Sequence, residues 1–203
     1  MPDDGRFHLT VHAEGPAADD GRIPLAELAR IVGGLQVTLE RIALSLETGT
    51  YAARGPRPRD VVEAVRLDFA GFRPGSVIID ITRPGQLEPD ELLERSLRAL
   101  EDGVAGIRAG NLPSHFTPQV VNGLRELAGG ITVGNLTSIT FGYSGHARFT
   151  IDSVFRERIR EISPSTAERE ATVVGRLQMG DFSCRAPMPR RYFRWQRAMR
   201  LRR

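Results

Sequence analysis

The chain has 203 residues, of which 40% are apolar and 26% are charged, which is enough to bury the core of an ordinary domain. No stretch approaches the roughly 18 consecutive apolar residues of a membrane span, and the acidic start Met1-Pro2-Asp3-Asp4 is unlike the basic opening of a signal peptide. We therefore expect a cytoplasmic protein. Its single cysteine, Cys184, cannot form an internal disulfide or a thiolate metal cluster.

All 28 basic side chains are arginines. A chain without lysine can form no lysine Schiff base and has no P-loop lysine, which excludes two large classes of enzyme. The charge is divided unevenly, because residues 184–203 hold eight arginines and no acid. The first 183 residues then carry 20 arginines against 25 acids, a formal charge of −5. Electrostatic arguments therefore apply separately to an acidic body and a basic tail.

Two segments near the start have clear periodicities. Residues 6–14 alternate apolar and polar side chains, which predicts a strand with one buried face. Pro24 suits the first position of a helix, and apolar side chains then recur at spacings of four and three from Leu28 to Leu46. This pattern predicts an amphipathic helix of roughly 24 residues.

A hairpin and a second helix are expected next. Residues 62–82 are predicted to turn around Pro74, in a register that places Phe69 opposite Ile79 and keeps the apolar side chains on one face. Apolar side chains at helical spacing then predict a second amphipathic helix from about Pro89 to Ala109.

Two glycine-containing stretches fall inside the predicted helices. Gly33-Gly34 costs helix stability, which indicates that another backbone approaches closely. Gly103-Val104-Ala105-Gly106 lacks the spacing and the preceding strand of a dinucleotide-binding fingerprint. It is instead interpreted as a site of close packing or as the end of a helix.

The third region repeats the pattern of helix and hairpin. Thr117-Pro118, a hydroxyl cap followed by proline, predicts the start of a shorter helix. Residues 137–152 predict a hairpin with Ser144-Gly145-His146 as its loop, followed by a helix over about 153–162. The expected register pairs Ile139 with Ile151, Phe141 with Phe149, and Tyr143 with Ala147.

The pattern changes again from Ala171. The stretch ATVVGRLQMGDFSCRA predicts the opening hairpin of a small β-barrel, turning at Gly180-Asp181. In the VVGRLQMGDF motif and in the order of elements across residues 6–183, the chain resembles uncharacterised bacterial proteins with a β-α-β-β-α domain followed by a small C-terminal barrel. The resemblance implies no catalytic residue and no cofactor, and the sequence departs from it where the barrel would continue.

These elements together predict an α+β fold. Paired strands that alternate with helices favour a mixed, mainly antiparallel sheet built from hairpins, with helices packed on one face. We expect an α+β domain over residues 1–165, an incomplete β-hairpin over 166–186, and a basic arginine/aromatic tail over 187–203.

One pair of acids is a candidate metal site. The predicted hairpin places Asp68 opposite Asp80 on the face away from the core, where two carboxylates could share a proton or bind a divalent ion. Such a site would suit a metal-dependent hydrolase. The interpretation we favour is that Arg66, Arg83 and solvent neutralise these acids on an exposed surface.

The histidines do not suggest a metal centre. His8 and His12 lie on the polar face of one strand, but roughly 13 Å of strand separates them, too far to share one ion. His115 and His146 fall in predicted loops without a second histidine at ligand spacing. We expect no bound cofactor or metal.

The basic tail is the most unusual segment. Arginines contact phosphates and aromatic rings stack on bases, which favours single-stranded nucleic acid or RNA as a partner. An anionic membrane surface would attract the same composition, and a solvated tail without a partner is an equal alternative. The candidate nucleic-acid-binding residues are Arg190, Arg191, Tyr192, Arg194, Trp195, Arg197 and Arg200.

No nucleophile, general base or cofactor loop is recognisable, so the sequence favours a non-catalytic protein over an enzyme. We expect a binding or regulatory protein that acts through protein–protein contacts, with a second copy of itself or with another protein. An antitoxin-like role toward a bacterial enzyme is one form of this hypothesis. The alternatives are a nucleic-acid-binding protein that uses the tail and a metal-dependent hydrolase that uses Asp68 and Asp80.

Overall fold

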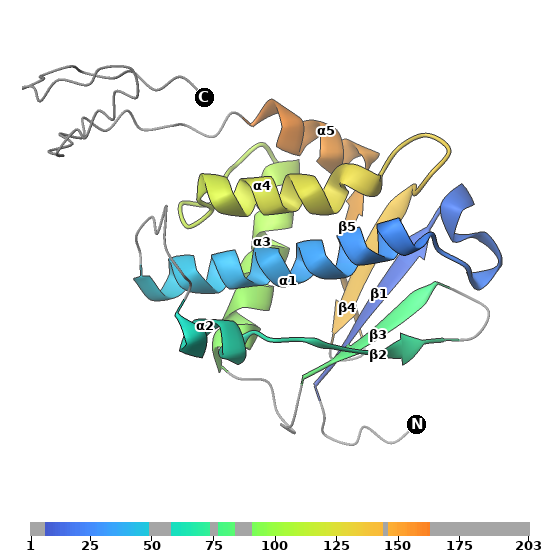
Figure 1. The fold of residues 1–203 in the computed structure, drawn as a ribbon. Coiled ribbons are helices and arrows are strands. Elements are labelled where there is room, and N and C mark those ends of the chain that lie inside the picture. Colours follow the sequence, from blue (N-terminus) through green and yellow to red (C-terminus); the bar gives the residue numbers. More distant parts are fainter. Residues whose placement is uncertain (1–6, 49–57, 74–76, 84–90, 144–145, 163–203) are drawn as a thin grey trace, which may run out of the picture. The chain divides into compact units, whose positions relative to one another are not determined.

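The computed structural model describes residues 7–48, 58–73, 77–83, 91–143 and 146–162. All of them belong to a compact unit over Met1–Ser165, whose strands and helices are drawn in Figure 1. The predicted hairpin over 166–186 and the tail over 187–203 lie outside the described residues. The elements, in chain order, are β1 (His8–Glu14), η1 (Pro16–Gly21), α1 (Leu25–Thr48), α2 (Arg59–Ala64), β2 (Asp68–Phe72), β3 (Ile78–Thr82), α3 (Glu91–Arg108), α4 (Pro118–Leu127), η2 (Ala128–Gly130), β4 (Ser138–Tyr143), β5 (His146–Asp152) and α5 (Ser153–Glu161).

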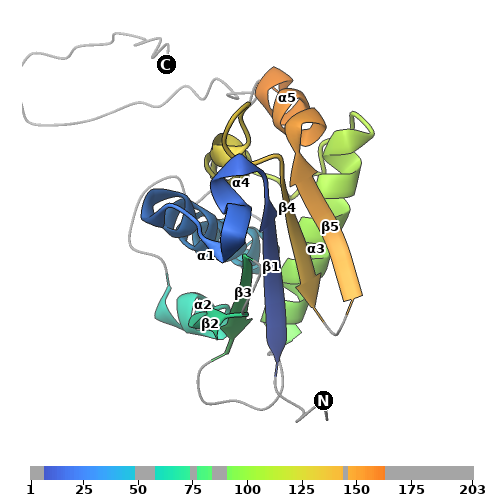
Figure 2. The same cartoon turned by 90° about the vertical axis from the view of Figure 1, so that its right-hand side faces the viewer.

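The strands form one antiparallel sheet. Their order is β2-β3-β1-β4-β5, and each neighbouring pair is antiparallel. Figure 2 shows β5 at one edge of the sheet with α3 behind it, and the helices gather on one side of the strands in Figure 1. The predicted α+β fold, with hairpin strands and helices on one face, is confirmed.

Alternation along the strands separates a buried face from a polar one. In β1, Leu9, Val11 and Ala13 are buried in the core, whereas His8 is exposed and His12 is half-buried. Successive side chains of a strand point to opposite faces, so the buried set faces the helices and the polar set faces away from them. The prediction that His8 and His12 share a polar strand face is confirmed.

Glycine allows two close contacts of the helices. Gly34 is buried, and a Cβ at this position would lie 3.3 Å from the Cα of Leu127 in α4. The predicted close approach of another backbone to α1 is therefore confirmed, and that backbone belongs to the same chain. In α3, a Cβ on Gly103 would lie 1.9 Å from a ring atom of Phe116, so this glycine permits close packing.

The helices after α2 follow the expected pattern. α3 and α5 begin and end within one turn of the predicted limits, and α4 begins at the predicted Pro118. The Thr117 hydroxyl caps α4 by accepting a hydrogen bond from the Val120 N–H at 3.4 Å. The Asp152 carboxylate caps α5 by accepting one from the Phe155 N–H at 2.9 Å. Each cap satisfies an N–H that has no partner within its helix.

The hairpin predicted over 62–82 starts later than expected. The short helix α2 occupies its first part, where Val61 and Val65 are buried four residues apart, the spacing of one helix face. The register also differs from the prediction. Phe69 lies opposite Ile81, not Ile79, because the turn lies later in the chain than predicted, with the Arg73 N–H hydrogen-bonded to the Ile78 oxygen at 3.0 Å. β2 also contains an extra residue between Phe69 and Gly71.

The second hairpin is correct except near its loop. Ile139 faces Ile151 and Phe141 faces Phe149, as expected. Tyr143, however, faces His146 instead of Ala147, because a second irregularity follows Phe141. His146 therefore belongs to β5 and not to the loop.

Candidate functional site

The sheet has two edge strands, β2 and β5. An edge strand has backbone N–H and C=O groups on one side without a partner strand, and proteins commonly block such an edge with charged side chains. The two edges of this sheet differ in the side chains that lie along them.

An arginine binds the β5 edge near its C-terminal end. Arg108, in the last turn of α3, donates a hydrogen bond to the backbone oxygen of Thr150 at 2.9 Å. The same guanidinium lies 2.7 Å from the Asp152 carboxylate. Burial alone raises the pKa of Asp152, but the hydrogen bond from the Phe155 N–H and the Arg108 guanidinium outweigh it, so this pKa lies below its usual range. A charged pair thus holds Arg108 against the edge strand.

The β2 edge carries two aromatic side chains. Phe69 and Phe72 are 52% and 46% exposed, and their ring centroids lie 5.3 Å apart in an edge-to-face arrangement. They lie opposite Ile81 and Ile79, which are buried on the helix side of the sheet. Both phenylalanines therefore point to the helix side but are left half uncovered at its margin. An exposed apolar patch on an edge strand is a typical contact surface for another chain.

The extra residue in β2 creates this pair. Side chains three residues apart on a regular strand point to opposite faces. The bulge after Phe69 brings Gly71 opposite Asp80 and Phe72 opposite Ile79, so both phenylalanines share one face. Gly71 has a φ of 157°, a backbone conformation that glycine adopts most readily.

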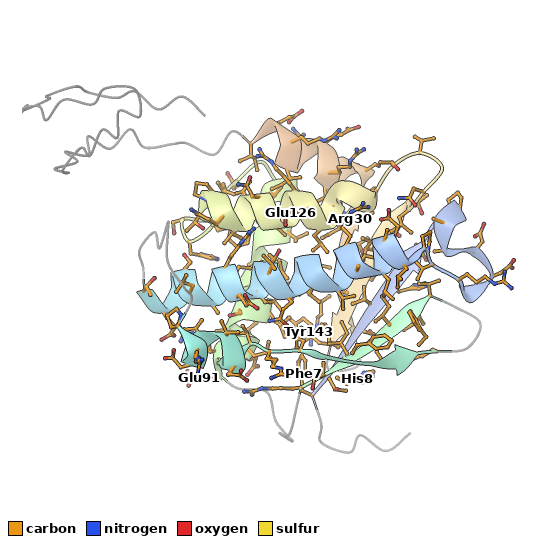
Figure 3. All side chains as sticks on the ribbon, viewed as in Figure 1. Phe7, His8, Arg30, Glu91, Glu126 and Tyr143 are labelled. Carbon is orange, nitrogen blue, oxygen red and sulfur yellow. The ribbon has the colours of Figure 1, made fainter. Side chains whose placement is uncertain are left out.

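Charged side chains flank the aromatic pair. Asp68 is 44% exposed, and its Oδ1 lies 3.7 Å from Nε of Arg66. Arg73, at the other end of β2, is 48% exposed and lies 3.0 Å from the Asp80 carboxylate. The His8 imidazole, labelled in Figure 3, lies 3.2 Å from the same carboxylate.

The predicted pairing of Asp68 with Asp80 is wrong. Asp68 lies opposite Thr82, two residues beyond Asp80, because the turn lies later in the chain than predicted, with the Arg73 N–H hydrogen-bonded to the Ile78 oxygen. Arg66 lies beside Asp68, as in the neutralisation that we favoured, and Arg73 forms an ion pair with Asp80. In the described ranges, no three His, Cys, Asp or Glu side chains are grouped so as to hold a metal ion.

No family model, curated protein or solved structure matches this chain. The resemblance to bacterial proteins with a C-terminal barrel therefore stays a prediction.

A shallow pocket of about 380 Å³ lies between α3 and the β4–β5 hairpin. Tyr143, labelled in Figure 3, donates a hydrogen bond to the Glu101 carboxylate, and Arg148 lies 4.7 Å above the tyrosine ring. Burial and the Glu101 carboxylate raise the pKa of Tyr143 above its usual range. Glu94 and Arg98 on the pocket wall form an ion pair. The polar groups of the pocket thus largely bind one another.

Other predicted site residues lie outside the described part of the chain. These include the nucleic-acid-binding candidates Arg190, Arg191, Tyr192, Arg194, Trp195, Arg197 and Arg200. Within the described part, none of the helices combines the length and apolar character needed to cross a bilayer.

The β2 edge was missed as a site by sequence reasoning, because Phe69 was expected in the core. A signal was present in Phe69-Ala70-Gly71-Phe72, since a glycine inside a strand often marks a bulge.

Proposed function

We propose that this protein is a non-catalytic binding protein that acts through protein–protein contacts at the β2 edge. The observation that supports the proposal is the half-exposed pair Phe69 and Phe72 on an edge strand. In this role, β2 receives an extended segment of a partner as an additional strand.

Strand addition explains why the aromatic pair lies where it does. Backbone hydrogen bonds to an edge strand provide affinity for any extended segment, and side-chain contacts on alternate positions provide selectivity. Phe69 and Phe72 lie on one face of β2 with their rings in contact, so they would contact apolar side chains on one face of the added strand. The contrast with β5, where Arg108 occupies the edge, also favours β2.

Photocrosslinking tests this proposal directly. Benzoylphenylalanine at position 72 is close in shape to the phenylalanine it replaces, and the same probe at Val154 of α5 provides the control. Val154 is 54% exposed, similar to the phenylalanines, but lies in α5, which follows β5 at the opposite edge of the sheet from β2. After irradiation in native cells, we expect a protein adduct of defined mass from position 72 and none from position 154.

A second change links the adduct to the aromatic pair. Phe69→Glu places a charge on the proposed contact face and should abolish the adduct while the far-ultraviolet circular dichroism spectrum stays the same. An equal yield from position 154, or no adduct from position 72, would contradict the proposed binding edge.

A further inference from the structure

β2 has an internal near-symmetry of side-chain chemistry. The segment begins with an acid, Asp68, and ends with a base, Arg73. Phe69 follows the acid and Phe72 precedes the base, with the small residues Ala70-Gly71 between the two aromatics. Reversing the strand exchanges the aromatics with each other and the acid with the base. A strand with this order is chemically complementary to an antiparallel copy of itself.

We propose that the partner at the β2 edge is a second copy of this chain, paired antiparallel through β2. This inference rests on the proposed binding edge and names its occupant. A two-fold axis perpendicular to the sheet, passing between Ala70 and Gly71, relates the two copies. It joins two five-stranded sheets into one continuous sheet of ten strands and gives an interface in which the same patch serves both subunits.

The faces of β2 agree with this pairing. Such an axis keeps the helix side of one copy on the helix side of the other. Phe69 and Phe72 both point to the helix side, since they lie opposite the buried Ile81 and Ile79. Phe69 of each copy then meets Phe72 of the other in a cross-strand aromatic contact.

The charges meet on the opposite face. Asp68 lies opposite Thr82 on the polar side, and Arg73 reaches the same side, where it contacts Asp80. In the paired copies, Asp68 of one faces Arg73 of the other, twice by symmetry. Both side chains are nearly half exposed in the single chain, so each is accessible for this contact.

The bulge is essential to this complementarity. Without the extra residue, Phe69 and Phe72 would point to opposite faces, as would Asp68 and Arg73. The irregularity between Phe69 and Gly71 therefore places both aromatics on one face and both charged side chains on the other. On each face they then lie opposite the matching side chains of a second copy.

Charge reversal distinguishes a contact between two copies from a structural role of these side chains within one chain. In Asp68→Arg alone, each symmetric contact sets arginine against arginine, and in Arg73→Asp alone it sets aspartate against aspartate. When the two variants are mixed, both contacts of the mixed pair join opposite charges. The double variant Asp68→Arg/Arg73→Asp likewise restores both contacts.

The measurement is the molar mass of the full-length chain by size-exclusion chromatography with light scattering, over a range of concentrations. We expect a wild-type dimer, a dissociation constant roughly tenfold higher for each single variant, and recovery in the mixture and in the double variant. Circular dichroism melts identify variants that remain folded.

A second experiment does not depend on charge reversal. In a Cys184→Ser background, Ala70→Cys lies beside the two-fold axis and should form a disulfide between copies on mild oxidation. The control Val154→Cys should not.

Two results would overturn the inference: a wild-type chain that stays monomeric, or a dimer that neither single variant weakens. If the chain is monomeric while the probe at position 72 still crosslinks a different protein, the second copy is rejected and the binding edge remains. If position 72 also gives no adduct, both proposals fail.

Discussion

Alanine substitutions at Gly103 and Gly33 should have opposite effects on stability, although both glycines lie inside long helices. In a helix interior, alanine is more favourable than glycine by about 1 kcal/mol. A Cβ on Gly33 meets no atom within 4 Å, so Gly33→Ala should gain this full amount. The new methyl group on Gly103 would instead lie 1.9, 2.3 and 2.8 Å from three ring atoms of Phe116.

The clash at Gly103 has no easy relief. Phe116 is only 4% exposed, so its ring cannot move without disturbing the core. Overpacking of this kind costs about 1–3 kcal/mol. Gly103→Ala should therefore be less stable than Gly33→Ala by about 1–3 kcal/mol in the free energy of unfolding, and no more stable than wild type.

Urea unfolding followed by circular dichroism at neutral pH measures both values. A double-mutant cycle identifies the cause, because Phe116→Leu removes the clashing ring edge and should make Gly103→Ala less costly than in wild type. If Gly103→Ala is as stable as Gly33→Ala, the close packing of α3 against Phe116 is incorrect.

Two further predictions concern titratable groups. The pKa of Asp152 is lowered in the folded state. Its contribution to the free energy of unfolding is therefore complete above the ordinary aspartate pKa of about 4 and declines as the pH falls below that value. As the pH falls below about 4, Asp152→Asn should therefore lose less of its stability toward urea than wild type does. If both proteins lose stability equally over this range, the contact between Asp152 and Arg108 is contradicted. The pKa of Tyr143 is raised, so the folded chain should show a tyrosine that ionises well above pH 10 in an absorbance titration. That late step should disappear in Tyr143→Phe, and its persistence there would assign it to another tyrosine.

Periodicity predicted the elements whose structure depends on local sequence. Alternation gives β1, and the recurrence of apolar side chains gives α1, because one buried face is sufficient to define each of them. Thr117-Pro118 predicted the start of α4, because a hydroxyl cap acts on an N–H group only three residues ahead in the sequence.

The proposed binding edge depends on information that lies elsewhere in the chain. The position of the bulge in β2 is set by how Phe69 and Phe72 pair with β3, and a shift of one residue exchanges the two faces. The contact between Tyr143 and Glu101 joins residues 42 positions apart, so no local pattern could indicate it. α2 was missed because a helix of six residues is too short to show a period.

The unequal edges of the sheet determine how far association can proceed. A sheet open at both edges can add copies without limit, as in fibrils. Here Arg108 binds the Thr150 oxygen near the end of β5, so β2 is the more open of the two edges. In the proposed dimer, the open β2 edge of both copies is used, and the sheet would end in two β5 strands that are each contacted by Arg108. A guanidinium at the opposite edge of the sheet from the proposed interface would thereby disfavour growth beyond the dimer.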